Sequence, residues 1–331
     1  MHRQVDAPER VPGSGAGRPP ALLAEMAQAM PLVHPRTSIV LVAWAVVLAL
    51  SLMPTVIVQE VLGQAVSPDL RAGSSAVVLV ASLALTLLWT PLCALRPFLS
   101  LFLVLVGAQW VVFTQVDRLP LIDGWLRDPS FGVYMPAEQG LNLIVTLAVI
   151  FLLLLVKRDR RAFFLAKGDT SAPAQPIPWL GVKRGDRWST LGPTLAVCIT
   201  LGTLAFLIIS GRPSMDLVTR ALPFLPIVLL AAALNAFNEE VTYKASFLSV
   251  LVEPVGSRNA LWMVAAYFGI AHFYGVPYGI VGVVLAWFLG WILARSMLET
   301  RGLWWAWLIH FVQDVAIFGF MAIGAITPGG G

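Results

Sequence analysis

The chain has 331 residues, of which 58% are hydrophobic and only 12% are charged, and its mean hydropathy is +0.81. Soluble domains carry about 25% charged residues, so this composition excludes an ordinary soluble protein and predicts an integral membrane protein. The formal net charge of +4 does not indicate nucleic-acid binding, because the basic residues flank the apolar runs. We therefore expect membrane lipids, and no nucleic acid, among its partners.

The first segment, residues 1–36, is rich in Pro, Gly, Ala and Arg. It lacks the basic start followed by a short apolar stretch that is typical of a secretory signal. We predict that it is a disordered cytosolic tail.

Apolar runs follow the tail, most of them close to the roughly 20 residues that a transmembrane helix needs. They lie near 38–58, 75–95, 97–116, 140–156, 190–210, 221–252, 259–274, 276–297 and 302–324. The run at 259–274 is short and contains polar residues, which favours a helix buried among other helices. The pattern predicts an all-α, polytopic membrane bundle of about eight or nine helices.

A basic segment divides these runs into two groups. Residues 37–156 are predicted to form a four-helix membrane region, 157–189 a basic cytoplasmic linker, and 190–326 a second membrane domain that holds the functional site. Few polar residues interrupt the apolar runs of the first region. We expect every unusual polar residue to lie in the second domain.

The distribution of Lys and Arg predicts the orientation. Residues 157–187 contain eight of them, more than any other loop, so this segment is expected in the cytoplasm. Counting back four spans places the N-terminus on the same side. The Ala-, Val-, Gly- and Arg-rich composition without a secretory signal favours the bacterial cytoplasmic membrane.

The most unusual residues are Glu239 and Glu240, adjacent to each other within an apolar run. A carboxylate at bilayer depth costs about 2.5–3.5 kcal/mol on insertion scales, and such residues usually mark a functional site. At 1.5 Å per helical residue, His272, His310 and Asp314 are expected at a similar depth on two other helices. The site is therefore predicted to combine two Glu, two His and one Asp.

Helical spacing predicts three pairs within this set. His310 and Asp314 are four residues apart and share a helix face, as do Phe268 and His272. Glu240 and Lys244 have the same spacing, in the order that favours an ion pair. One neutralised carboxylate would leave the other free to exchange a proton with water, which is the chemistry of a peptide-bond hydrolase.

These residues resemble the motifs of the CPBP family of intramembrane proteases, which includes the CAAX prenyl proteases, bacteriocin-processing proteins and Abi proteins. The family motifs read Glu-Glu-x-x-x-Arg, Phe-x-x-x-His and His-x-x-x-Asn/Asp. The matching positions here are Glu239-Glu240-Val-Thr-Tyr-Lys244, Phe268-Gly-Ile-Ala-His272 and His310-Phe-Val-Gln-Asp314. Lys244 stands where the family has Arg, and it lacks the planar fork that binds a carboxylate through two bonds.

The resemblance implies an endopeptidase that cleaves a membrane-associated or lipidated peptide at a site open to the cytoplasm. Glu239 and Glu240 would activate water together with His272. His310 and Asp314 would complete the site, as metal ligands or as an oxyanion-stabilising pair, with Lys244 and Phe268 in support. One divalent metal such as zinc, held by Glu240, His272 and His310, and a metal-free mechanism are equally open.

Two other functions stay open from the sequence. The Lys in the first motif is compatible with a non-catalytic member of the family that acts as an immunity or scaffold protein. A proton-coupled transporter is less favoured, because the polar residues concentrate in one half and no internal repeat is found. The physiological substrate and the oligomeric state are not predicted.

Overall fold

The computed structural model describes residues 37–157 and 159–327, and within these residues every regular element is a helix. The all-α fold class is thereby confirmed. The predictions made for residues 1–36 lie outside the described residues. Two isolated bridges, between Pro173 and Arg187 and between Ile177 and Val182, are the β-type pairings of this part of the chain.

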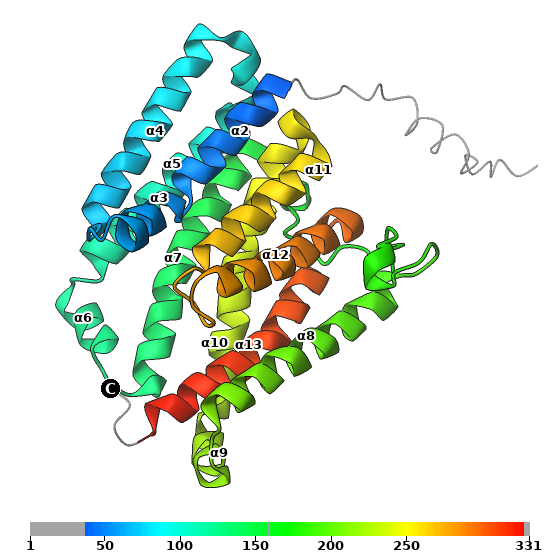
Figure 1. The fold of residues 1–331 in the computed structure, drawn as a ribbon. Helices are drawn as coiled ribbons and strands as arrows, with labels where there is room; N and C mark the ends of the chain where they lie inside the picture. The colour runs from blue at the N-terminus through cyan, green and yellow to red at the C-terminus, as the bar shows by residue number, and fades with distance from the viewer. Residues whose placement is uncertain (1–36, 158, 328–331) are drawn as a thin grey trace, which may run out of the picture. The chain divides into compact units, whose positions relative to one another are not determined.

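The first half contains four long helical stretches, two of which end in a π-helical turn; Figure 1 shows their arrangement. Its elements are α2 (Thr37–Leu50), α3 (Met53–Val56), η1 (Ile57–Val61), α4 (Pro68–Leu88), η2 (Thr90–Leu95), α5 (Arg96–Val111), η3 (Val112–Val116), α6 (Pro120–Leu126) and α7 (Phe131–Lys157). Ser67 caps α4 through its side-chain oxygen, and Pro68 occupies the first helical position. Both are common signals of a helix start.

The second half begins with short 3-10 turns and then continues as helices. Its elements are η4 (Arg160–Phe163), η5 (Pro178–Leu180), α8 (Trp188–Gly211), α9 (Met215–Ala221), η6 (Leu222–Phe224), α10 (Leu225–Glu239), η7 (Glu240–Ala245), α11 (Ser246–Ala271), α12 (Ile280–Thr300) and α13 (Trp304–Ala325). In Figure 1, α13 and α8 run side by side, and the two helices contact each other.

Seven helices of the described residues are long and apolar enough to cross a membrane, or eight if the bent pair of α2 with α3 and η1 counts as one span. The predicted number was eight or nine. The difference arises because the runs at 221–252 and 259–274 belong to one helical stretch, Met215–Ala271. A kink at Gly256, whose φ of 79° lies outside the helical region, separates its two parts.

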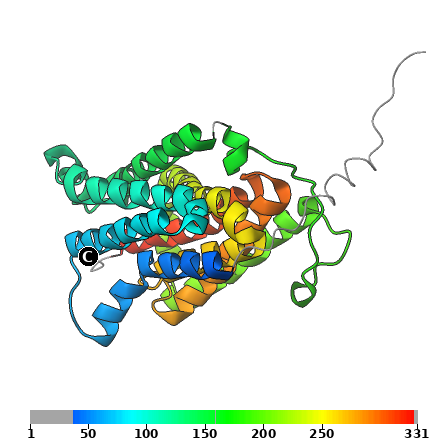
Figure 2. The same cartoon turned by 90° about the horizontal axis from the view of Figure 1, so that it is seen from above.

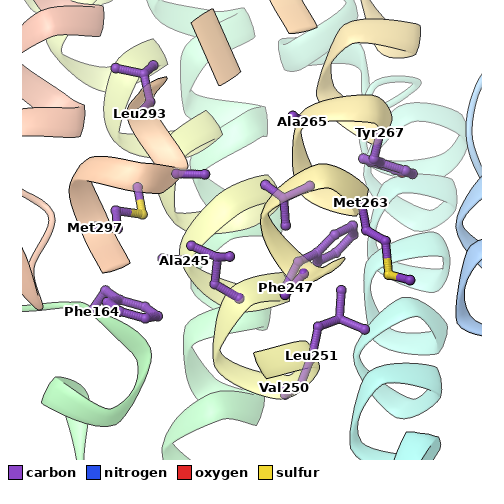
Figure 3. Close-up of a cluster of buried hydrophobic side chains, with 14 of the residues drawn as sticks. Phe164, Ala245, Phe247, Val250, Leu251, Met263, Ala265, Tyr267, Leu293 and Met297 are labelled. Atoms are coloured by element: carbon purple, nitrogen blue, oxygen red, sulfur yellow. The ribbon is translucent and has the colours of Figure 1, made fainter. Parts of the chain in front are cut away.

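An apolar core joins the two halves through the helix that follows the paired glutamates. Phe247 of α11 contacts Phe102 of α5, with ring centroids 4.7 Å apart, and Tyr267, with centroids 5.0 Å apart. Figure 3 shows Phe247 and Tyr267 in this cluster together with Met263. All three side chains are buried. Aromatic pairs of this kind add about 0.5–1.5 kcal/mol each beyond the area they bury, so α11 is held firmly against α5.

Residues 159–169, which follow α7, pack against the end of α12 (Figure 2). Phe163 and Phe164 are buried. The backbone N–H of Asp169 donates to the carbonyl of Thr300, and the N–H of Leu303 donates to the carbonyl of Ala166. These bonds fix the turn from which α13 starts, and α13 carries the third motif.

The turn depends on a close backbone approach between two glycines. A Cβ atom on Gly302 would overlap the backbone of Lys167 and Gly168. We expect Gly302→Ala to lower the free energy of unfolding by about 1–3 kcal/mol, the usual cost of overpacking, as measured by thermal unfolding in detergent. Gly319→Ala in α13 is the control, because nothing lies within 4 Å of the added Cβ. Equal stability of the two variants would contradict the prediction.

Candidate active site in the membrane

A π-helical turn begins at the second glutamate of the first motif. Glu239 ends α10, and Glu240–Ala245 form η7 before α11 continues. Single π-helical turns inside longer helices occur frequently at functional sites, because they rotate the side chains that follow. Here the turn contains both Glu240 and Lys244.

Glu240 is fully buried and bound by two donors. Its Oε1 atom accepts from Lys244 Nζ at 2.8 Å and from His310 Nδ1 at 2.7 Å. The Lys244 ammonium also lies 3.2 Å from the centroid of the Phe268 ring. Both partners of the Glu240–Lys244 pair have no exposed side-chain surface. The predicted ion pair is therefore present, and Lys244 supplies the positive charge that the family Arg would bring.

Glu239 is in a different environment. About 24% of its side chain is exposed, and among the described residues its Oε2 atom has no hydrogen-bond partner. That atom lies 3.7 Å from His310 Nε2. Glu239 also lines a small polar cavity of about 50 Å³, which is enough for water, since one water needs roughly 10–15 Å³ by this measure.

His310 connects the two glutamates to Asp314. Its Nε2 atom lies 3.5 Å from Asp314 Oδ2, on the shared face predicted from the four-residue spacing. Asp314 Oδ2 also accepts a hydrogen bond from Asn235 Nδ2 at 2.9 Å. Asn235 was not predicted as a site residue. The sequence feature that could have identified Asn235 is its position four residues before Glu239, which puts both residues on one face of α10.

His272 is placed at the edge of the cluster by Phe268. The His272 and Phe268 ring centroids are 4.4 Å apart, and the Phe268 and His310 centroids are 6.2 Å apart. His272 Nδ1 is hydrogen bonded to the Phe268 carbonyl at 2.8 Å. No hydrogen bond or ion pair joins His272 to the glutamates among the residues described. The predicted Phe268–His272 contact is present, and Gly290 of α12 leaves the space in which Phe268 packs.

Helix α7 of the first half also contributes to the site. The cavity beside Glu239 is lined by Asn142 and Thr146 as well as by residues of α10 and η7. Thr146 Oγ1 bonds Asn238 Oδ1 at 3.0 Å, and Asn238 Nδ2 donates to the Gln139 carbonyl at 3.2 Å. The expectation that every unusual polar residue lies after the linker was therefore wrong. Isolated Asn, Gln and Thr residues in an apolar run are a weak signal of a functional site, because membrane helices also carry them where they face a neighbouring helix.

The residues named as possible metal ligands, Glu240, His272 and His310, are not brought together as a group of three in the described part of the chain. Across 37–157 and 159–327, no three His, Cys, Asp or Glu side chains are grouped closely enough to hold a metal ion. Glu240 Oε1 accepts from Lys244 and His310, whereas its Oε2 has no hydrogen-bond partner among the described residues. His272 Nδ1 is bonded to a backbone carbonyl. A cation at Lys244 Nζ also opposes a second cation beside Glu240.

A polytopic helical membrane protein that buries an ion-paired Glu beside a partly exposed Glu, a His and an Asp has the groups that a membrane-embedded hydrolase needs. Residues 221–316 match the family model described as type II CAAX prenyl endopeptidase Rce1-like. The resemblance inferred from the three motifs is thereby confirmed over these residues. At the level of that family, the match suggests a CAAX protease-like membrane peptidase. No curated protein and no solved structure matched the chain.

Proposed function

We propose that the protein is an intramembrane endopeptidase that hydrolyses a peptide bond in a membrane-associated or lipidated substrate. The observation that carries this proposal is the difference between the two adjacent glutamates. Glu240 is fully buried and is fixed through Oε1 by Lys244 and His310, whereas Glu239 is about 24% exposed and lines a polar cavity. Among the residues described, the Oε2 atom of each carboxylate has no hydrogen-bond partner. A carboxylate in the setting of Glu239 is suited to act as a general base.

In the proposed mechanism Glu239 takes a proton from a water molecule in the cavity, and the resulting hydroxide attacks the peptide carbonyl carbon. The carbonyl π bond opens to give a tetrahedral oxyanion. Glu239 then returns the proton to the amide nitrogen as the carbon–nitrogen bond breaks, leaving a carboxylic acid and an amine. No step in this scheme uses a metal ion, and the metal-dependent alternative stays a separate prediction.

The other motif residues support this step. His310 donates through Nδ1 to Glu240, so its Nε2 side faces Glu239 and Asp314. His272 donates from Nδ1 to the Phe268 carbonyl, which leaves Nε2 of the neutral ring as an acceptor for the water. Nε2 donates to the carbonyl oxygen of the substrate only when the ring is protonated. Buried hydrogen-bond donors aimed at a developing oxyanion are usually the largest contribution to such catalysis.

We place the end of the helices that carries residues 159–187 in the cytoplasm. Within the described chain, the Lys and Arg residues at this end are Arg96, Lys157, Arg160, Arg161, Lys167, Lys183, Arg184, Arg187, Arg258, Arg295 and Arg301. The opposite end carries fewer, which fits the positive-inside rule. A bacterial cytoplasmic membrane and a cytoplasmic N-terminus remain predictions.

The direct test is cleavage by purified protein in lipid nanodiscs. A mixture of S-farnesylated and unmodified synthetic peptides would be incubated in ¹⁸O-labelled water, and the products would be identified by mass spectrometry. We expect new peptide C-termini that carry one ¹⁸O atom from water. Intact peptides in all mixtures, with a correctly folded protein, would contradict the proposed function.

Asn235 is expected to position Asp314. Asn235→Ala removes the 2.9 Å hydrogen bond to the Asp314 carboxylate, and bonds to charged groups contribute about 1.5–3 kcal/mol. We expect the cleavage rate to fall about 10- to 100-fold, with KM little changed. Asn259→Ala, which removes a bond to the Val255 carbonyl, is the control. A rate equal to that of this control would contradict the assignment.

A further inference from the structure

The small cavity beside Glu239 is enclosed by three helical elements, and the polar groups in its wall are not equally used. Its volume is about 50 Å³, so the guest that fits it is water. The wall is formed by α7, α10 and η7, and its polar side chains besides Glu239 include Asn142, Thr146, Asn235, Asn238 and Tyr243. The hydrogen bonds that these side chains already make decide which of them can bind a water molecule.

Three of the polar side chains are engaged within the protein. Thr146 Oγ1 bonds Asn238 Oδ1 at 3.0 Å, and Asn238 Nδ2 donates to a backbone carbonyl of α7 at 3.2 Å. Asn238 thus uses both ends of its amide to join α10 to α7. Asn235 Nδ2 donates to the Asp314 carboxylate at 2.9 Å. These side chains hold the helices and Asp314 in place.

Asn142 and Tyr243 are different, because each keeps hydrogen-bonding capacity beside the cavity. The backbone carbonyl of Asn142 accepts from Thr146 Oγ1 at 3.0 Å, but its side-chain amide bonds to no residue of 37–157 or 159–327. The Tyr243 hydroxyl accepts from Gln109 Nε2 at 2.9 Å, and its own hydrogen has no acceptor in the described chain. Within the same residues, Glu239 Oε2 is also without a partner.

These groups match what a nucleophilic water needs. A water molecule donates two hydrogens and has two lone pairs, and a buried one usually has two to four polar partners. One hydrogen can go to Glu239 and the other to the amide oxygen of Asn142, while the Tyr243 hydroxyl donates to one lone pair. The second lone pair is then free to attack the carbonyl carbon, and its direction is fixed by the other three bonds.

We propose that Asn142 binds and orients the water molecule that Glu239 deprotonates, with the Tyr243 hydroxyl as the third partner of that water. The proposal rests on the proposed protease function and adds to it a water-binding residue from α7. Asn142 lies outside residues 221–316, the region that matches the family model. The catalytic unit therefore includes a side chain from the first half of the chain.

The first test separates kcat from KM in full-length protein in nanodiscs. Asn142→Leu replaces the amide with an apolar side chain of similar size, and we expect kcat to fall about 10- to 100-fold, the effect of losing a buried hydrogen bond to the reacting water. KM should stay within about twofold, because the groups that bind substrate are unchanged. Asn259→Leu, which removes an amide bonded to the Val255 carbonyl, is the control. A kcat equal to that of this control would overturn the proposal.

A pair of smaller variants decides the question even if Asn142→Leu folds poorly. Asn142→Ser and Asn142→Ala are nearly equal in size, but only Ser has a hydroxyl that can both donate to and accept from water. We expect kcat of Asn142→Ser to exceed that of Asn142→Ala by at least about threefold, with equal unfolding temperatures. Equal kcat values for the two would overturn the proposal, because the position would then matter only for packing.

A second readout does not depend on turnover. Infrared difference spectra against Glu239→Gln isolate the carboxyl band of Glu239, whose frequency depends on the hydrogen bonds to its oxygens. We expect this band to shift in Asn142→Leu and to stay in place in Asn259→Leu. A shift without cleavage by the wild-type protein would support the water site and contradict the protease. Cleavage with an unshifted band and an unchanged kcat in Asn142→Leu would do the reverse.

Discussion

Glu239→Gln is expected to lower the cleavage rate by about 10²–10⁴-fold, the usual contribution of a general base, and to leave thermal unfolding unchanged. Glutamine keeps the size of the side chain but cannot accept a proton at neutral pH. Stability should be retained because Glu239 is partly exposed, and within the part of the chain that the structure describes its Oε2 atom bonds to nothing. The rate would be measured with purified protein in nanodiscs and the unfolding by differential scanning fluorimetry.

Glu253→Gln is the matched control for this experiment. Glu253 lies on α11 in the same helical stretch and is exposed, so its replacement removes a carboxylate without touching the cavity. Its rate should stay within about twofold of the wild-type rate. A Glu239→Gln variant as active as this control would show that another group activates the water.

Lys244→Met is expected to lower the free energy of unfolding by about 3–5 kcal/mol, because it leaves the buried Glu240 carboxylate without its closest cation. Methionine fills a similar space beside the Phe268 ring, so the loss should come from the charge. Lys244→Arg should keep the pair and preserve or raise activity, since Arg is the residue of the family motif. Chemical unfolding in detergent, followed by tryptophan fluorescence, would measure all variants.

A double variant separates charge from packing at this pair. Glu240→Gln with Lys244→Met removes both charges, and we expect it to be more stable than Lys244→Met alone, because no unpaired charge then remains buried. If Lys244→Met unfolds like the wild type, the carboxylate of Glu240 is neutralised by other means. In that case the proposal that Glu240 is the ion-paired carboxylate and Glu239 the general base is no longer supported.

The parts of the site that follow helical spacing could be predicted from the sequence. The Glu240–Lys244 pair, the Phe268–His272 contact and the shared face of His310 and Asp314 are each four residues apart. Side chains at this spacing meet whatever the rest of the fold does. The number of helices was harder to predict, because a glycine kink inside a continuous helix looks like a loop between two spans in a hydropathy pattern.

Contacts between helices could not be predicted in the same way. The hydrogen bond from Asn235 to Asp314 and the polar face of α7 near Glu239 depend on how the helices are rotated about their axes. The π-helical turn adds to this rotation after Glu239. For the same reason, the sequence did not indicate that His310 also binds Glu240 or that Glu239 lines the cavity.

The most direct test of the proposed protease activity is a comparison of membrane peptides from cells that produce the wild-type protein and cells that produce Glu239→Gln at equal level. Quantitative mass spectrometry would identify peptide termini in the membrane fraction. We expect a set of new C-termini that are present with the wild type and absent with Glu239→Gln. Identical sets of termini in the two samples, with both proteins folded and inserted in the membrane, would contradict a protease and favour the non-catalytic immunity or scaffold role.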